Sequence, residues 1–189
     1  MKASGKLSSP MKATLFATFL LLFGITDAAY ARDWNLKDRD GTHYTLSGLH
    51  GKWVLVNFWA PWCPPCIQEM PDLAALQQKH NNLQVIGVVV MYESRKSVTD
   101  MVSKLSVTYP IVFGNEDTAG DFGGLVGLPT SILYSPSGEL VGHHQGILTQ
   151  LEIEQAIEQK TGCRSANHPL TCRTLLAMIQ KPHPKYTQA

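Results

Sequence analysis

Charged residues are scarce in this sequence, and its hydrophobic runs are short. Only 16% of the 189 residues are charged, and 16 basic residues nearly balance 15 acidic ones. A basic surface of the kind that binds nucleic acid is therefore not expected. The apolar run from Ala13 to Ile25 falls short of the roughly 20 residues that a membrane-spanning helix needs. The chain also has no internal repeat and no low-complexity stretch.

The N-terminal segment has the order of a secretory signal peptide. Three lysines precede the apolar run, and Ala29-Tyr30-Ala31 follows it, which predicts cleavage after Ala31 and a periplasmic protein. An uncleaved membrane anchor is the alternative. The remaining residues carry 13 basic and 14 acidic side chains, a formal charge of −1, and fit one domain. We expect a signal peptide over 1–31, a domain over 32–161 and a C-terminal extension over 162–189.

Only four cysteines are present, and two of them lie close together in Trp62-Cys63-Pro64-Pro65-Cys66. Two intervening residues place both sulfurs within bonding reach when Cys66 lies in the first turn of a helix. Cys63 then lies at the helix start, where unpaired N–H groups and the helix dipole favour the thiolate that attacks disulfides. The pair therefore predicts a redox-active dithiol. A permanent disulfide and a metal-ligand pair are the alternatives, and no second close Cys or His pair has metal-site spacing.

Hydrophobic patterns and turn residues predict an α/β fold. An N-terminal hairpin is expected over 32–50, and the late strands should form a second hairpin around Ser135-Pro136-Ser137-Gly138. Thr149 and Glu152 form a capping box for the last helix, which we expect Gly162 to end at about Thr161. The other expected elements are strands over 53–59, 83–90, 109–113, 130–134 and 139–144, and helices over 64–80, 96–105 and 118–125.

The sequence resembles the thioredoxin superfamily, and more closely its exported branch of TlpA-, ResA- and DsbE-like thiol–disulfide oxidoreductases. The resemblance covers about residues 33–161. It rests on the block from Asn57 to Cys66, on Glu69, on Pro71 and on Gly127-Leu128-Pro129-Thr130. It implies a thioredoxin fold, in which helices flank a central mixed β-sheet, with an N-terminal hairpin and a TlpA-type central insertion.

The dithiol and a carboxylate beyond it are the expected catalytic residues. Cys63, preceded by Trp62, should be the nucleophile with its sulfur on an exposed shelf, and Cys66 should resolve the mixed disulfide. Asn57 stands where cytosolic thioredoxin carries a buried aspartate, and an amide cannot accept a proton at neutral pH. Glu69, one turn after Cys66, is the expected base, as the exported branch also has a glutamate there. A solvated helix carboxylate is the alternative for Glu69.

The proline loop is the expected substrate platform. The resemblance implies a cis peptide bond before Pro129, which would let the Leu128 backbone pair with an extended substrate segment. A trans proline in an ordinary loop is the alternative. Trp62 should line the docking surface, whereas Trp59 should pack beneath the dithiol.

Cys163 and Cys172 lie beyond the region of resemblance. In an oxidising compartment we expect them to form a structural disulfide, worth roughly 2–3 kcal/mol by the chain-entropy model. A second redox pair is the alternative. We expect no metal, and no cofactor other than the redox-active disulfide.

The resemblance implies a soluble, monomeric periplasmic reductase of protein disulfides, such as those of apocytochrome c or copper-site proteins. A membrane electron donor of the DsbD or CcdA type would keep it reduced. Leu128-Pro129-Thr130-Ser131 lacks the DsbE glutamate pattern, which favours the TlpA or ResA type.

Three other functions compete with the reductase hypothesis. A DsbA-like oxidase would use the same residues in reverse. A peroxiredoxin would need a Thr-x-x-Cys segment of a kind that is not found here. A non-enzymatic copper chaperone would separate its cysteines by three residues and supply a distal histidine.

Overall fold

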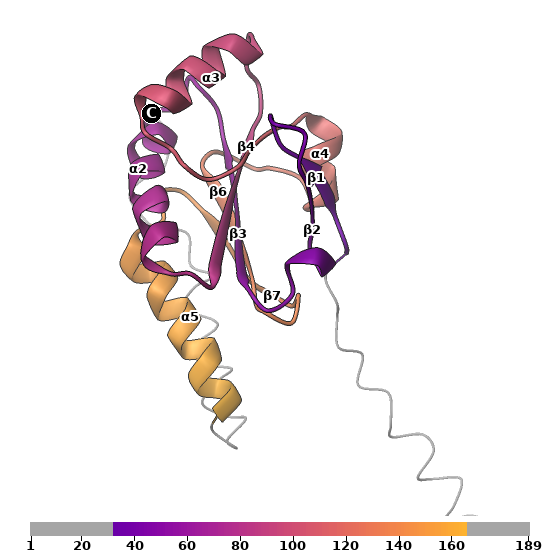
Figure 1. Ribbon diagram of the computed structural model, residues 1–189, viewed down its shortest axis with the longest axis vertical. Coiled ribbons are helices and arrows are strands. Elements are labelled where there is room, and N and C mark those ends of the chain that lie inside the picture. The colour runs from indigo at the N-terminus through magenta and orange to yellow at the C-terminus, as the bar shows by residue number, and fades with distance from the viewer. Residues whose placement is uncertain (1–31, 166–189) are drawn as a thin grey trace, which may run out of the picture.

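The computed structural model describes residues 32–165 (Figure 1). Its main sheet has five strands in the order β5-β4-β3-β6-β7. The β3–β4 and β4–β5 pairs are parallel, and the β3–β6 and β6–β7 pairs are antiparallel, so the expected mixed sheet is confirmed. The strands are β1 (Asn35–Lys37), β2 (His43–Thr45), β3 (Trp53–Trp59), β4 (Leu83–Val89), β5 (Ile111–Phe113), β6 (Thr130–Tyr134) and β7 (Leu140–Gln145). The helices are η1 (Ser47–Leu49), α2 (Pro64–Lys79), α3 (Arg95–Lys104), α4 (Glu116–Asp121) and α5 (Gln150–Ser165).

Strand β3 lies at the centre of the sheet, and all seven of its residues are buried. Because successive side chains of a strand point to opposite faces, its apolar residues fill two cores. Leu55 and Trp59 belong to one cluster, and Val56 and Phe58 belong to the other. Asn57 shares the face of Leu55 and Trp59, so a polar side chain enters the first core.

The two faces of the sheet are covered by different elements. Helices α2, α3 and α5 cover the Trp59 face, to which they contribute Leu73, Val98 and Ile153. The β1–β2 hairpin and the segment around α4 cover the other face, as Figure 1 shows. This arrangement places the N-terminus of α2 at the end of β3, where the Cys63 motif begins.

Helix α5 continues to Ser165, so the expectation that Gly162 ends it at about Thr161 is wrong. Glycine ends a helix when it adopts a left-handed conformation, and the φ angle of Gly162 lies outside that region. A glycine inside a helix costs only about 1 kcal/mol relative to alanine, which a helix anchored by buried residues tolerates. Ile153 and Ala156 supply that anchor.

Helix α4 also differs from its expected range of 118–125. Asn115 caps it through a reciprocal capping box with Thr118, which starts the helix at Glu116. Gly123 and Gly124 have φ values of 90° and 83°, and this left-handed backbone follows the end of the helix at Asp121. Strand β5 is shorter than expected as well, because it begins only after Pro110.

Candidate active site

A disulfide joins Cys63 and Cys66 at the start of α2. Cys63 is the N-cap residue, and its Sγ accepts a hydrogen bond of 3.3 Å from the backbone N–H of Cys66. Pro64 and Pro65 occupy the first two helical positions, where their missing N–H groups cost little. The expected helix start at the dithiol is therefore confirmed. After reduction, the same N–H group and the helix dipole would stabilise a thiolate on Cys63.

The oxidised sulfurs are shielded from solvent. Cys63 is 4% exposed, so the expectation of a sulfur on an exposed shelf is wrong for this form. The bonded cysteines pack into the apolar cluster that contains Trp59 and Ala60, and this packing covers them. Trp62 is instead the exposed group, at 61%. Its Nε1–H donates a 2.9 Å hydrogen bond to the Met91 carbonyl, which fixes the indole against the segment after β4.

Glu69 is buried three residues along α2 from Cys66, with 2% of its surface exposed. Its Oε1 accepts a 2.8 Å hydrogen bond from Asn57 Nδ2, and its Oε2 accepts one of 3.0 Å from the Leu148 backbone N–H. It is therefore not a solvated helix carboxylate. Burial raises the pKa of Glu69 to about 7, although the bonds from Leu148 and Asn57 oppose that rise. A carboxyl group with this pKa can both accept and release a proton near neutral pH.

Two partners in this network were not predicted from the sequence. Ser131 Oγ accepts a 3.0 Å hydrogen bond from Asn57 Nδ2 because the β3–β6 register pairs Asn57 with Ser131. Leu148 lies in the segment between β7 and α5. The register of a correctly paired β3 and β6 would have identified Ser131. No sequence pattern around Leu148 predicts that its backbone N–H contacts Glu69.

Tyr109 is a further buried group beside this network. It is 3% exposed, and its hydroxyl has no hydrogen-bond partner among residues 32–165. Burial raises the pKa of Tyr109, and the nearby charge of Glu69 raises it further, so its phenol stays neutral. Its ring packs over Gly87, where an added Cβ would lie 2.9 Å from Tyr109 Cε2 and 3.3 Å from Trp59 Nε1. As expected, Trp59 is completely buried.

The Leu128–Pro129 peptide bond is cis, as the resemblance implies. The Leu128 side chain packs against both apolar clusters. Its backbone N–H and C=O form no hydrogen bond with the described residues, whereas the Pro129 carbonyl accepts one of 2.8 Å from the Gly146 N–H. The Leu128 backbone can therefore pair with an extended segment that is added to the sheet.

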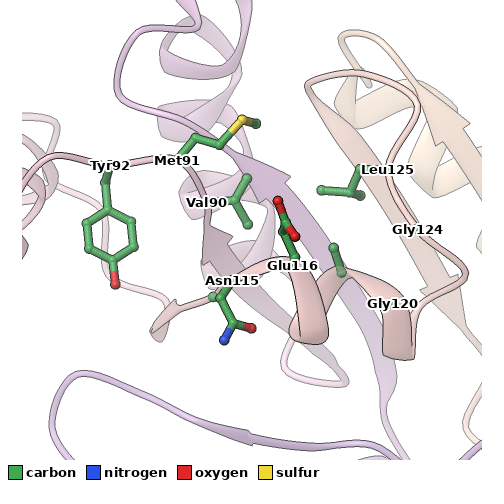
Figure 2. A pocket seen from close by; sticks show the side chains of 10 residues that line it. Val90, Met91, Tyr92, Asn115, Glu116, Gly120, Gly124 and Leu125 are labelled. Carbon is green, nitrogen blue, oxygen red and sulfur yellow. The ribbon is translucent and has the colours of Figure 1, made fainter.

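A pocket of about 590 Å³ opens between the segment after β4 and helix α4 (Figure 2). Met91 links the pocket to Trp62 through the hydrogen bond described above. In Figure 2 the Glu116 carboxylate lies between Val90 and Leu125. The pocket is therefore mainly apolar, carries one acid and adjoins the residue that precedes the dithiol.

Several expectations concern metals, membranes and the second cysteine pair. Within residues 32–165, no group of three or more His, Cys, Asp or Glu side chains is arranged to hold a metal ion. No helix in this described range is long and apolar enough to cross a membrane. The predicted signal peptide over 1–31 lies outside the described residues, and so does Cys172 of the predicted Cys163–Cys172 disulfide.

A model of the AhpC/TSA family matches residues 28–143, which is more than half of the sequence. The chain belongs to the AhpC/TSA family. The central sheet, the Cys63–Cys66 disulfide and the cis proline all lie in or next to the matched region.

Curated relatives and solved structures agree on the fold and on the enzyme class of this AhpC/TSA family member. It is 33% identical over 138 residues to the thioredoxin-like protein YneN of Bacillus subtilis, an alignment that covers 71% of this chain and 81% of YneN. It is 34% identical over 125 residues to the thiol-disulfide oxidoreductase ResA of Halalkalibacterium halodurans, with 65% and 70% of the two chains covered.

A thioredoxin-family thiol:disulfide interchange protein of Chlorobium tepidum superposes with a TM-score of 0.61 at 27% identity, covering 68% of this chain and 92% of that one. The protein therefore has a thioredoxin fold and is a thiol–disulfide oxidoreductase.

Proposed function

We propose that this oxidoreductase is exported and reduces disulfides in client proteins, with Cys63, Cys66 and Glu69 as its catalytic residues. The observation that carries the proposal is the placement of the Cys63–Cys66 disulfide at the N-terminus of a helix that also carries a buried carboxyl group one turn further on. A dithiol reaction needs a stabilised thiolate and a proton acceptor, and α2 supplies both.

In the first step, the Cys63 thiolate attacks one sulfur of the client disulfide. A bond forms between Cys63 and that sulfur while the client S–S bond breaks. The second client sulfur leaves as a thiolate and takes up a proton. The backbone N–H of Cys66, which donates to Cys63 Sγ, stabilises the attacking thiolate.

In the second step, Glu69 accepts the proton of the Cys66 thiol, and the resulting thiolate attacks Cys63 Sγ. The mixed disulfide breaks, and the client leaves with both sulfurs reduced. Two electrons have moved from the dithiol to the client, and the enzyme is left with the disulfide that the structure shows. A carboxyl group with a pKa of about 7 suits this transfer because it binds and releases the proton near the working pH.

Client docking is assigned to Trp62, Leu128 and Pro129. The unpaired Leu128 backbone offers one donor and one acceptor to an extended client segment. Trp62 adds an exposed apolar surface beside Cys63. Protein clients such as apocytochrome c or copper-site proteins fit this surface, and a membrane donor of the DsbD or CcdA type would return the electrons.

Two measurements test this function. Equilibration of the mature protein with glutathione buffers gives its reduction potential, which we expect to lie well below that of a DsbA-like oxidase. Cys66→Ser should accumulate mixed disulfides on Cys63, whereas Cys63→Ser should abolish exchange. A potential near that of DsbA would overturn the reductase assignment. Full exchange activity in Cys63→Ser would overturn the assignment of the dithiol.

A further inference from the structure

Asn57 lies in a polar row across the helix-covered face of the sheet. The strand registers place it between Gly87 of β4 and Ser131 of β6. Its neighbours on the same face of β3, Leu55 and Trp59, belong to the apolar cluster. Asn57 and Ser131 are almost completely buried, and burying an amide or a hydroxyl is costly unless it is hydrogen-bonded.

The nitrogen of the Asn57 side-chain amide is hydrogen-bonded, whereas its oxygen has no partner within residues 32–165. Its Nδ2 donates to Glu69 Oε1 at 2.8 Å and to Ser131 Oγ at 3.0 Å. Its Oδ1 is buried and accepts no hydrogen bond from the described residues. An unpaired buried acceptor reduces stability, and an aliphatic side chain at this position would avoid that cost. Asn57 therefore lowers the stability of the core but provides a hydrogen-bond donor to Glu69.

We propose that Asn57 and Ser131 are positioning residues that keep the Glu69 carboxylate charged and fixed one turn from Cys66. Asn57 does so by donating to Glu69 Oε1, and Ser131 does so by anchoring the Asn57 amide. The inference rests on the proposed role of Glu69 as the base. Asn57 cannot carry the proton itself, but it contributes to the reaction by positioning Glu69.

The physical basis is the balance between burial and hydrogen bonding at Glu69. A donated N–H stabilises the charged carboxylate and lowers its pKa, whereas burial raises it. The second N–H donor, Leu148, approaches from the segment between β7 and α5. Loss of the Asn57 donor should therefore leave Glu69 protonated up to a higher pH and slow the deprotonation of Cys66.

Other titratable side chains lie on or next to the elements around Glu69, and none of those described below donates a hydrogen bond to its carboxylate. Tyr109, which precedes β5, stays neutral near neutral pH. His144 follows Ser131 in the polar row, and its Nε2 lies 3.2 Å from the Ile147 carbonyl. On α5, Glu154 binds Lys79 and His80 at the opposite end of α2 from Cys66. Cys66 does not titrate while it is bonded to Cys63.

The test follows the Glu69 carboxyl carbon by ¹³C NMR as a function of pH in the oxidised mature protein, with Glu69→Gln to assign the resonance. We expect Asn57→Leu to raise the titration midpoint by about one pH unit, equivalent to about 1.4 kcal/mol, since it removes one of the two N–H donors to the charged carboxylate. Ser131→Ala should raise it by less, in the same direction. Ser131→Thr retains the hydroxyl and should restore the original midpoint.

Ser135→Ala is the matched control. It removes a buried hydroxyl that follows the far end of β6 and bonds Ser137 and Glu139, so it should lower stability without moving the midpoint. If Asn57→Leu fails to fold, the titration midpoints of Ser131→Ala and Ser131→Thr test the inference instead. An unchanged midpoint in Ser131→Ala overturns the inference. Because the readout is the titration of Glu69, full exchange activity in Glu69→Gln would overturn only the proposed base.

Discussion

At the scale of single residues, Glu69 combines a proposed catalytic role with nearly complete burial. Its side chain is buried among apolar residues and is held by two N–H donors. The sequence predicted its role through the resemblance and through its spacing from Cys66. Leu148, which donates to Glu69, and Ser131, which accepts a hydrogen bond from Asn57, lie 79 and 62 positions from Glu69 in the chain. Only the strand register and the loop path bring them to Glu69, so local sequence patterns could not reveal them.

Glu69 should make the oxidised protein less stable as the pH rises. Its folded pKa of about 7 exceeds the ordinary value of 4.5, so the folded state binds more protons than the unfolded state between these values. Stability falls as pH increases through that window. Glu69→Gln removes this dependence, and its unfolding free energy relative to wild type should increase by about 2 kcal/mol from pH 5 to pH 8.

Urea denaturation of the oxidised proteins at a series of pH values measures this difference. Gln can be accommodated because the Asn57 amide can turn its unpaired Oδ1 toward the new donor. A difference that does not change with pH would show that Glu69 titrates near its ordinary value.

At the scale of elements, the sequence predicted those whose apolar pattern is continuous or whose cap is adjacent. Strand β3 is buried on both faces and reads as one apolar run, and Cys63-Pro64-Pro65-Cys66 marks the start of α2. The bounds predicted for α4 were wrong, because its glycine-rich sequence has little periodicity and its capping box begins at Asn115. The predicted end of α5 at Gly162 was wrong because a glycine ends a helix only when its backbone adopts a left-handed conformation, which the sequence alone does not specify.

Two glycines provide a matched pair of substitutions at this scale. In Gly87→Ala, the new Cβ would lie 2.9 Å from both Ile111 Cδ1 and Tyr109 Cε2, and such overpacking should destabilise the protein by about 1–3 kcal/mol. In Gly120→Ala, the Cβ meets nothing within 4 Å in helix α4. That change should stabilise the protein by about 0.4–1 kcal/mol.

Thermal or urea unfolding of the two variants beside the wild type measures both effects. Equal destabilisation by the two alanines would mean that backbone flexibility rather than the Tyr109 contact governs position 87.

At the scale of the whole molecule, a helix-covered sheet places three groups at one end: the dithiol at the N-terminus of α2, the cis proline before β6 and the pocket beside α4. The family and the thioredoxin fold were both anticipated by the sequence, because the Cys63 motif, Glu69 and Pro129 occur in the expected order. The predicted signal peptide over 1–31 and residues 166–189 of the predicted C-terminal extension lie outside the described residues, so both predictions require a direct chemical test.

Mass spectrometry of the protein expressed in a bacterial host with its full N-terminal segment supplies that test. We expect the mature chain to begin at Arg32. Trypsin cleaves after Lys160, Arg164 and Arg173, so a Cys163–Cys172 disulfide would join peptides 161–164 and 165–173 in a non-reducing digest. Reduction should separate them. Detection of the two peptides as unlinked thiols before reduction would exclude the structural disulfide.

The burial of the oxidised sulfurs also affects which thiols can react with the disulfide. Cys63 is 4% exposed, and the indole of Trp62 is fixed beside it by the bond to Met91. A small thiol diffusing past this surface has little direct access to either sulfur, whereas a protein segment that pairs with Leu128 can be guided to it. If the proposed function is correct, this burial should make exchange of the disulfide with small thiols slower than exchange with a protein partner that docks at Leu128.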